Sequence, residues 1–332
     1  MVSESDVSVQ GHGVHTAYDE LASALEKRQD ITVIRGAFGK LVECEIVHFH
    51  TMGSQTWRKL FQRGPKKIVS AHIVPASFIG SIILARYWLF LARWYMSWYY
   101  NRADKVLAVS GTVAEILHKE LHVPNEKIEI FYNTINMSHY AFGPKDKEEA
   151  RKRLQLREDS FVVLGLGQVQ PRKRLDIFVK MAEALPDVTF IWVGGIPFKQ
   201  LGADYVSMQH LINSVPSNFK ITGVVPHTQV RDYMAAADVF CLPAEQENHP
   251  MCVLEAAGSK LPIILRDIPE YKDTFGTDAV LCHDDDFIPA VKRLRDDKVA
   301  YKKQQQKTKA IAKRFDSSAA AESIIKLYKQ LI

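Results

Sequence analysis

The most informative segment of this chain is Asp238-Val-Phe-Cys-Leu-Pro-Ala-Glu-Gln-Glu-Asn-His-Pro-Met-Cys-Val-Leu-Glu-Ala-Ala257. It reads as a buried strand, a polar turn and a helix that begins near Pro250. A parallel sheet presents ligand sites at the carboxyl edge of its strands, which is where this turn lies. Glu247 and Glu255 could therefore hold a polyhydroxylated ligand. Alternatively, Glu247 caps the helix and Glu255 is an ordinary surface residue.

Short apolar runs alternate with helix-like segments on both sides of this stretch. In the first half, the expected strands are 7–10, 31–34, 46–49, 67–71, 105–109 and 128–132, with helices such as 16–28 and 113–121 between them. In the second half, the expected strands are 161–165, 188–193, 219–222, 238–242, 262–265 and 279–282. This alternation predicts an α/β fold with two doubly wound, Rossmann-like domains that face a cleft.

The alternation breaks at residues 140–149, where glycine, proline and dense charge indicate a linker. We therefore expect an amino-terminal domain over residues 1–143 and a carboxyl-terminal domain over 144–310. Residues 311–332 are expected to form a helix that packs back on the amino-terminal domain. A chain of 332 residues, of which 47% are apolar, is long enough to bury two cores.

The cysteine content and the amino-terminal sequence favour a cytoplasmic protein. Four cysteines are scattered without a Cys-x-x-Cys pair, which is typical of reduced thiols rather than of disulfides or a zinc site. The first residues lack the basic start and apolar run of a signal peptide.

Positive charge is concentrated between Arg58 and Lys105, where nine basic residues accompany one acidic residue. Charge alone would also fit a solvated face or a nucleic-acid patch. This region, however, contains the aromatic and aliphatic run 78–100, which is long enough to span a bilayer. Arg86 and Arg93 would each cost about 2.5 to 3.5 kcal/mol inside the hydrocarbon, which disfavours a span.

Residues 78–100 instead have the pattern of an interfacial helix. Arg86 and Arg93 share one helical face, and the opposite face carries Leu84, Trp88, Leu91, Tyr95 and Trp98. Basic residues beside tryptophan, tyrosine and leucine are what such helices use to bind anionic lipid head groups. The alternative is an amphipathic helix that only covers the amino-terminal sheet.

Two strand-to-helix turns could hold phosphate. Gly13 lies in the turn Gln10-Gly-His-Gly-Val-His15, where backbone N–H groups can approach an anion at a helix start. The turn lacks the third glycine of a dinucleotide motif, which disfavours NAD. Across the expected cleft, Arg172, Lys173 and Arg174 can place positive charge near a diphosphate leaving group.

Histidines mark the carboxyl ends of two expected strands. His72 should face the cleft, although a lone histidine there is often only structural. His48 and His50 alternate toward one side of their strand, but spacing suggests no third metal ligand. We therefore expect no metal site.

The segment Glu-x7-Glu, followed by Ala-Ala-Gly and Lys260-Leu-Pro-Ile-Ile264, resembles the donor-site signature of retaining glycosyltransferases of family 4. That family has the GT-B fold. The resemblance runs from the glycine turn at Gly11 to Glu255. It implies that a sugar nucleotide binds mainly to the carboxyl-terminal domain.

The resemblance also implies roles for individual residues. The second glutamate of the motif, here Glu255, would hold the ribose hydroxyls, and Glu247 would contact hydroxyls of the transferred sugar. The lysine of the family's Gly-Arg-Leu-x-x-x-Lys-Gly element matches Lys173 and would bind the diphosphate. His72 matches the cleft histidine near the donor sugar, and Gly13 matches the amino-terminal phosphate turn.

The chain departs from the family pattern at three positions. Gln168 replaces the usual arginine and Arg174 replaces the usual glycine, so Arg172 would have to supply the missing charge. Pro250 stands where many members have glycine and has no N–H to offer a phosphate. The Met251 amide would take its place.

The motif, taken with Arg266-Asp-Ile-Pro-Glu-Tyr271, resembles bacterial membrane-surface enzymes that make diglycosyl diacylglycerols. This implies retaining transfer of glucose or galactose from a UDP-sugar to monoglucosyl diacylglycerol, with no metal or other cofactor. The implied partners are the UDP-sugar, the glycolipid and an anionic membrane surface, with no nucleic acid. The implied location is cytoplasmic, peripherally bound to the inner face of the cell membrane.

Three alternatives remain at this point. The chain could glycosylate another lipid or a polysaccharide, or it could be a sugar-nucleotide epimerase of the same fold. It could also be a catalytically silent peripheral membrane protein that binds a nucleotide sugar.

Overall fold

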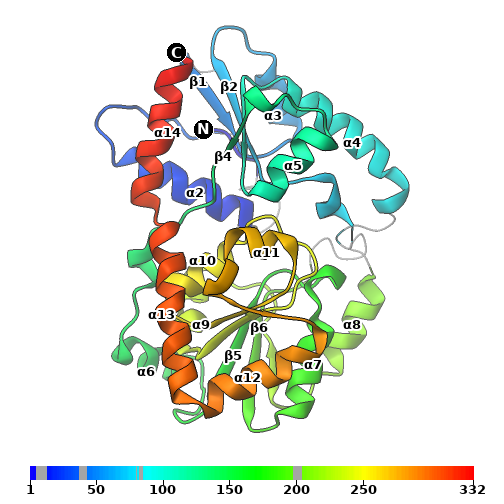
Figure 1. The fold of residues 1–332 in the computed structure, drawn as a ribbon, viewed down its shortest axis with the longest axis vertical. Coiled ribbons are helices and arrows are strands. Elements are labelled where there is room, and N and C mark those ends of the chain that lie inside the picture. Colours follow the sequence, from blue (N-terminus) through cyan, green and yellow to red (C-terminus); the bar gives the residue numbers. More distant parts are fainter. Residues whose placement is uncertain (5–12, 37–42, 80, 82–84, 197–203) are drawn as a thin grey trace.

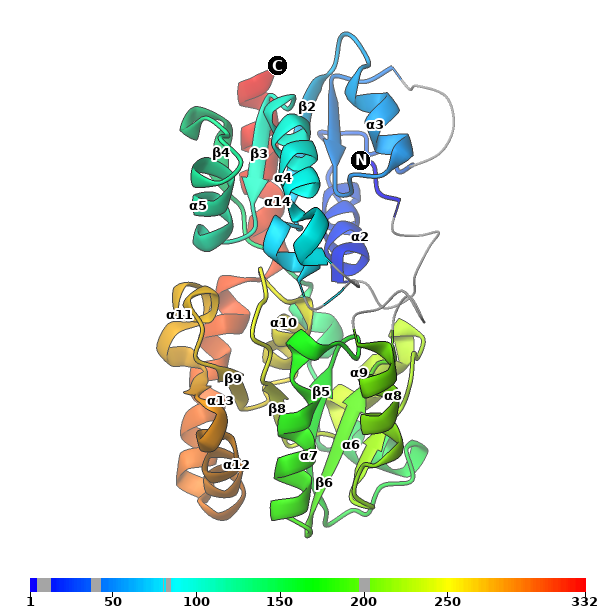
Figure 2. The same ribbon diagram turned by 90° about the vertical axis from the view of Figure 1, so that its right-hand side faces the viewer.

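The computed structural model of the protein describes residues 1–4, 13–36, 43–79, 81, 85–196 and 204–332. Two parallel sheets with helices around them lie one above the other along the long axis (Figures 1 and 2). This confirms the predicted α/β class with two doubly wound domains.

The amino-terminal sheet has the strand order β1-β2-β3-β4, and every pairing is parallel. Its strands are β1 (Ile46–Phe49), β2 (Lys66–Ala71), β3 (Lys105–Ala108) and β4 (Ile128–Ile130). Their inward residues are the β-branched and aliphatic side chains of the expected runs. The helices around it are α2 (Gly13–Glu26), α3 (Ser54–Leu60), α4 (Ala85–Asn101) and α5 (Gly111–Lys119).

Two strands predicted near the amino terminus have different outcomes. The first, 7–10, lies outside the described residues. The second prediction was wrong, because residues 31–34 form no strand. Instead of joining the ladder, this segment meets the start of the chain, where the Met1 amino group donates to the Ile34 carbonyl (2.8 Å).

The carboxyl-terminal sheet has the order β10-β9-β8-β5-β6-β7, also all parallel. Its strands are β5 (Phe161–Leu166), β6 (Val188–Val193), β7 (Phe219–Ile221), β8 (Val239–Leu242), β9 (Ile263–Arg266) and β10 (Val280–Cys282). The strand order reverses between β5 and β8. A crevice at the carboxyl ends of these two strands is where open α/β sheets bind ligands.

Helices cover both faces of this second sheet and fill the space between its strands and the linker. They are α6 (Pro144–Arg153), α7 (Leu175–Ala184), α8 (Tyr205–Asn213), α9 (His227–Ala236), α10 (Met251–Gly258), α11 (Pro269–Thr274) and α12 (Phe287–Asp296). The linker is shorter than predicted, because α6 begins at Pro144 and takes up the charged residues that follow it. Proline is favoured at this first helical position because its missing N–H would have no partner there.

The chain passes between the domains twice, and the two passes lie side by side. The first follows β4, and the second joins α13 (Lys298–Arg314) to α14 (Ser317–Leu331). Ile135 of the first pass forms a parallel bridge with Asp316 of the second. Elsewhere, Asp273 of α11 accepts a hydrogen bond from the Gly111 N–H at the start of α5 (2.9 Å).

Helix α14 belongs to the amino-terminal domain although it is the last helix in sequence. It lies beside α2 in both ribbon views. Its apolar face shares a core cluster with that domain, formed by Leu21, Leu25, Ile68, Leu107, Ala321, Ile324, Ile325 and Leu327.

Candidate functional site

Glu247 and Glu255 are both buried at the carboxyl end of β8, and they come from different elements. Glu247 lies in the loop after the strand, whereas Glu255 lies in α10, whose residues are all buried. A helix with no exposed face leaves no room for an ordinary surface glutamate, so the simple surface interpretation of Glu255 fails. Burying two carboxylates requires partners for each.

Glu247 is paired with two cations from the turn after β5. Lys173 Nζ donates to Glu247 Oε1, and both residues are buried. Arg172 Nη1 lies 3.2 Å from the same oxygen and donates to the Gln246 carbonyl at 2.8 Å. The switch point of the sheet therefore brings together residues that are about seventy positions apart in sequence.

The charge state of Glu247 follows from this pairing. Burial raises its pKa, but the charges of Lys173 and Arg172, together with their hydrogen bonds, outweigh burial and leave the pKa below its ordinary value. Glu247 is therefore a carboxylate at neutral pH. The three side chains carry a net charge of about +1, which suits an anionic ligand.

Arg174 has a different task from Arg172. Its φ of 55° lies in the left-handed region that favours glycine, which agrees with a glycine being usual here in the family it resembles. Its guanidinium forms ion pairs with Asp176 (2.8 Å), Glu245 (2.6 Å) and Asp284 (2.9 Å). Arg174 thus ties the loops after β5, β8 and β10 together rather than facing the crevice as a free cation.

Glu255 has one satisfied and one unsatisfied oxygen. Its Oε1 accepts from the Tyr140 hydroxyl (3.3 Å) and lies 3.1 Å from His227 Nε2. Within the described part of the chain, its Oε2 is buried without a hydrogen-bond partner. The hydrogen bond to Glu255 raises the pKa of His227. The unsatisfied oxygen can accept a hydrogen bond from a ligand hydroxyl.

Sequence reasoning missed both partners of Glu255. Tyr140 lies in the segment that we expected to be a linker, and His227 opens α9. Neither belongs to a recognisable motif. The one available signal was that His227 follows Pro226 at a strand-to-helix turn, which lies at the ligand edge of the sheet.

Gly13 and Met251 face each other across the domains. Each is the first residue of its helix, and a Cβ built on Gly13 would lie 3.9 Å from Met251 Cγ. The positive ends of α2 and α10 therefore meet in the crevice, where they favour an anion. The preceding residues of the glycine turn, 10–12, lie outside the described residues.

His72 is placed at the boundary between the domains. It follows β2, and its carbonyl accepts from Asn248 Nδ2 (2.7 Å), next to Glu247 in the opposite domain. Its Nε2 lies 3.0 Å from His50 Nδ1, so one imidazole must donate and the other accept. Burial lowers the pKa of His72 to about 4, and the ring is therefore uncharged at neutral pH.

The other two histidines of this row are held by hydrogen bonds to protein groups. His48 lies 2.7 Å from the Tyr328 hydroxyl and 2.8 Å from Ser70 Oγ. Burial lowers the pKa of both His48 and His50. The residues that the structure describes contain no group of three or more His, Cys, Asp or Glu side chains placed to hold a metal ion.

His249 anchors the loop that carries Glu247. It is enclosed by Tyr132, Phe275 and Phe315, with Phe275 stacked at 5.7 Å. Its carbonyl accepts from Asn133 Nδ2 (2.8 Å) in the first interdomain pass. The loop is thereby fixed to the region where both passes run. A movement of one domain relative to the other would therefore shift Glu247.

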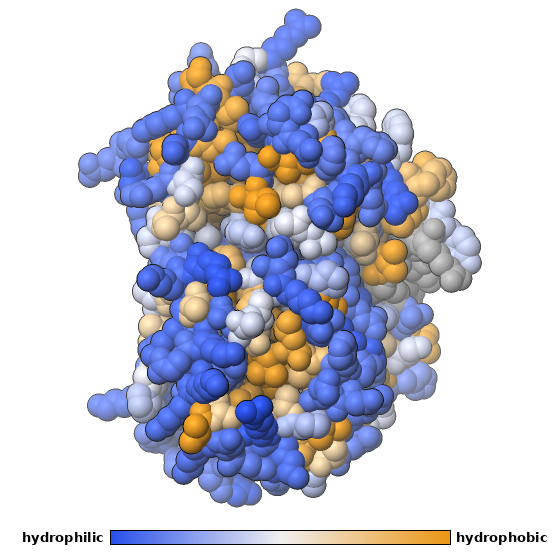
Figure 3. Space-filling model, viewed as in Figure 1, coloured by the Kyte–Doolittle hydropathy of each residue, from blue (hydrophilic) through white to orange (hydrophobic). Residues whose placement is uncertain are grey.

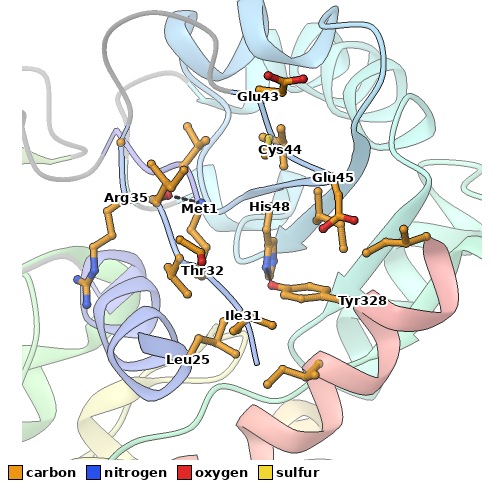
Figure 4. Close-up of a pocket in the computed structure, with 18 of the residues that line it drawn as sticks. Met1, Leu25, Ile31, Thr32, Arg35, Glu43, Cys44, Glu45, His48 and Tyr328 are labelled. Atoms are coloured by element: carbon orange, nitrogen blue, oxygen red, sulfur yellow. Dashed lines mark hydrogen bonds between the residues drawn. The ribbon is translucent and has the colours of Figure 1, made fainter. Parts of the chain in front are cut away.

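The described residues line two cavities of interest. The larger, of about 970 Å³, lies between β1, residues 31–36 and α14, with His48 and Tyr328 in its wall (Figure 4). None of Lys173, Glu247 or Glu255 lines it, so it is separate from the crevice. The smaller, of about 580 Å³, adjoins Arg172 and Gln246.

The helix proposed to face the membrane, α4, has two apolar sides. Of the residues predicted to bind the membrane, Leu91 and Arg93 are exposed, whereas Trp88, Tyr95 and Trp98 are half-buried. Trp88 packs on Phe78, and the other two join the amino-terminal core. The side chain of Arg86, like all of Leu84, lies outside the described residues.

The large apolar side chains of α4 that reach solvent are a different set. We call them the outer face of α4, and they are Tyr87, Phe90, Leu91 and Trp94. Trp57 of α3 and Phe61, which follows this helix, are also exposed and pack on Trp98, where Arg102 lies 4.8 Å from the indole centroid. Hydrophobic residues gather at the right-hand edge of the molecule, where α4 lies (Figure 3). No helix among the described residues is long and apolar enough to cross a membrane.

Two family models match the chain, one for each domain. Residues 146–315 match "Glycosyl transferases group 1", and residues 32–139 match "Glycosyltransferase Family 4". The alpha-galactosylglucosyldiacylglycerol synthase of Streptococcus pneumoniae is 34% identical over 82% of this chain and 73% of that protein. The processive diacylglycerol alpha-glucosyltransferase of Acholeplasma laidlawii is 27% identical over 69% of this chain and 68% of that protein.

Solved structures show the same fold. Anabaena HepE in complex with UDP and glucose superimposes with a TM-score of 0.69 at 19% identity, over 80% of this chain and 72% of that one. WaaG, a glycosyltransferase involved in lipopolysaccharide biosynthesis, gives a TM-score of 0.67 at 16% identity and covers 97% of both chains.

Proposed function

Because this chain belongs to the group 1 and family 4 glycosyltransferases and has their GT-B fold, we propose that it extends a membrane glycolipid by one hexose. The donor is a UDP-sugar carrying glucose or galactose, and the acceptor is monoglucosyl diacylglycerol. The product is a diglycosyl diacylglycerol with the anomeric configuration of the donor retained.

One observation carries this proposal: the buried pairing of Glu247 with Lys173 and Arg172 at the switch point of the sheet. The carboxylate can orient hydroxyls of the donor sugar while the two cations bind its diphosphate. The helix ends at Gly13 and Met251 add positive potential on the same side. Glu255 Oε2 is available for the ribose hydroxyls.

The proposed reaction proceeds on one face of the donor sugar. The bond between the anomeric carbon and the β-phosphate oxygen breaks, and the acceptor hydroxyl oxygen bonds to the same carbon from the same side. The hydroxyl proton passes to an oxygen of the departing diphosphate. Lys173 and Arg172 stabilise the negative charge that develops there, which a metal would otherwise have to do.

The test is transfer itself, measured with the purified chain in mixed micelles. UDP release should depend on added monoglucosyl diacylglycerol, with either UDP-glucose or UDP-galactose as donor. Mass analysis of the lipids should show one added hexose, and linkage analysis should show the retained configuration. UDP release that is equal with and without the glycolipid, or a lipid product that gains no hexose, contradicts the proposal.

The proposal includes binding to the membrane surface through the outer face of α4. Aromatic and aliphatic side chains that are more than half exposed would gain apolar contact in the interface. Arg93 lies on the same helix and pairs with Glu120 (3.0 Å), and Arg102 lies over Trp98. The half-buried Trp88, Tyr95 and Trp98 instead support this face from within. They are therefore poor positions at which to test membrane binding.

Replacing Phe90 and Trp94 together with serine should release the protein from vesicles that contain anionic lipid. Both side chains are exposed, at 66% and 69%, so the fold should not depend on them. Val299→Ser on α13 is the matched control, because this valine is 77% exposed on another element. Sedimentation with phosphatidylglycerol vesicles measures the effect, and we expect at least a tenfold loss of bound protein. Equal sedimentation of the double variant and the control would exclude this face as the membrane contact.

A further inference from the structure

The smaller cavity is an apolar slot beside the proposed donor site. Six of the described residues that line it are apolar: Ala76, Ile79, Pro171, Leu175, Met208 and Leu211. The polar residues that line it are Arg172, Arg174, Asp176, Glu245 and Gln246. Its volume of about 580 Å³ lies in the usual range of small-molecule sites, about 300 to 1,000 Å³. We call it the slot.

The polar side of the slot is shared with the candidate site. Arg172 reaches Glu247 with Nη1 and, with Nε, donates to Ser81 Oγ (2.9 Å) in the other domain. Gln246 immediately precedes Glu247 in the loop. A molecule in the slot would therefore have one end within a side-chain length of the place proposed for the transferred sugar.

The apolar side of the slot leads toward α4. Ala76 lies in the short helix Pro75–Phe78, and Ile79 follows it and is 49% exposed. The chain then continues into α4, whose outer face is the proposed membrane contact. Figure 1 shows α8, which supplies Met208 and Leu211, on the same side of the molecule as α4. The slot therefore lies between α8 and the segment that precedes α4.

The lining decides which part of a substrate could occupy this slot. A nucleotide or a free sugar would leave its hydroxyls and phosphates against six apolar side chains, where each unpaired polar group costs about 1 to 3 kcal/mol. A glycerol backbone with the first methylenes of its acyl chains would meet apolar walls instead. Arg172 and Gln246, which adjoin Glu247, could pair with its ester oxygens, whereas Arg174 is already paired with carboxylates.

We propose that the slot binds the glycerol and proximal acyl portion of the glycolipid acceptor. It would thereby hold the acceptor sugar beside the transferred sugar that Glu247 orients, while the rest of the lipid stays in the membrane. This inference rests on the proposed function, because it names the part of the acceptor that the enzyme recognises besides its sugar.

The test uses the full chain with Met208 and Leu211 both replaced by glutamine. These residues are half-buried on α8, so glutamine keeps the helix while making the wall polar. Val206→Gln is the matched control, since Val206 lies on the same helix, is 66% exposed and is not among the residues that line the slot. Vesicle sedimentation should be the same for both variants. Because Met208 and Leu211 also pack against the core of this domain, both proteins are assayed at a temperature where thermal unfolding shows them folded.

Two acceptors separate recognition of the lipid from recognition of the sugar. With monoglucosyl dioleoylglycerol in mixed micelles, the KM of the double variant should rise about tenfold, equivalent to about 1.4 kcal/mol. With methyl glucoside, which lacks glycerol and acyl chains, kcat/KM should match that of the control. If kcat/KM falls equally for both acceptors, or for neither, the slot does not bind the lipid portion.

A binding measurement distinguishes failure of the slot from failure of the proposed function. Dihexanoyl monoglucosyl glycerol is titrated calorimetrically into each protein without donor. A Kd about ten times higher in the double variant supports the slot even if no hexose is transferred, in which case only the proposed reaction fails. An unchanged Kd overturns the slot, whatever the turnover.

Discussion

Replacing Lys173 with methionine should lower kcat by about two to three orders of magnitude, the usual cost of removing one preorganised charge-stabilising group. Methionine fills similar space but leaves Arg172, among the described residues, as the only side-chain cation paired with Glu247. Because the charge on the leaving diphosphate grows during the reaction, the fold-decrease in kcat should exceed the fold-increase in the Kd of the donor. Steady-state kinetics with a saturating donor measure it.

This substitution also leaves a buried carboxylate with fewer partners, which could weaken the fold on its own. The double variant Lys173→Met with Glu247→Gln removes both charges of the pair and tests the fold alone, because Glu247 is itself assigned to the donor sugar. It should regain the melting temperature of the parent. If Lys173→Met keeps the kcat of the parent at a temperature where it stays folded, Lys173 only stabilises the fold and has no role at the diphosphate.

Replacing Glu255 with alanine should raise the Kd of UDP about ten- to one-hundredfold and change kcat little. This loss of affinity is expected because hydrogen bonds from hydroxyls to a charged carboxylate contribute about 1.5 to 3 kcal/mol to binding. The unpartnered Oε2 is the atom assigned to the ribose. Isothermal titration with UDP measures the change.

A modified ligand makes this assignment specific. UDP that lacks both ribose hydroxyls should bind parent and Glu255→Ala with the same Kd, because the contact is absent in each case. Tyr140→Phe provides a milder comparison, since it removes one hydrogen bond to Oε1 and keeps the carboxylate. A Glu255→Ala penalty that persists with the modified ligand would place Glu255 away from the ribose.

The sequence predicted the strands of the second domain well because each is a short, uninterrupted apolar run between polar turns. It failed at residues 31–34, where an apolar run of the same kind does not join the sheet. Local pattern cannot tell which segment will occupy an edge, since pairing is decided by neighbours that are distant in sequence. The linker was misjudged for a related reason, because charged residues after Pro144 suit an exposed helix as well as a loop.

The candidate site was predicted only as far as its motifs reached. Glu247 and Lys173 each stood in a recognisable segment, but nothing in the sequence showed that they form an ion pair. Tyr140 and His227 contact Glu255 only because tertiary packing brings them together. The role of Arg174 became evident only from its left-handed backbone and its three carboxylate partners.

Helix α4 shows why periodicity could not choose the membrane side. Tryptophan, tyrosine and leucine occur on both of its faces, so a stripe at helical spacing is found in either direction. Tyr95 and Trp98 pack against the core together with Tyr99 and Met96, whereas Phe90 and Trp94 are exposed. Burial against a particular sheet, which sequence spacing does not encode, decided between them.

The position of α14 affects how the protein can be made. Leu21 and Ile68 leave the ribosome well before α14, the helix that completes their cluster, which is synthesised some 250 to 300 residues later. Until Ile324 and Ile325 have been synthesised, the apolar surface that they cover on the first domain stays exposed. The second domain has no such dependence and can fold first, reversing the usual order in which domains mature during translation.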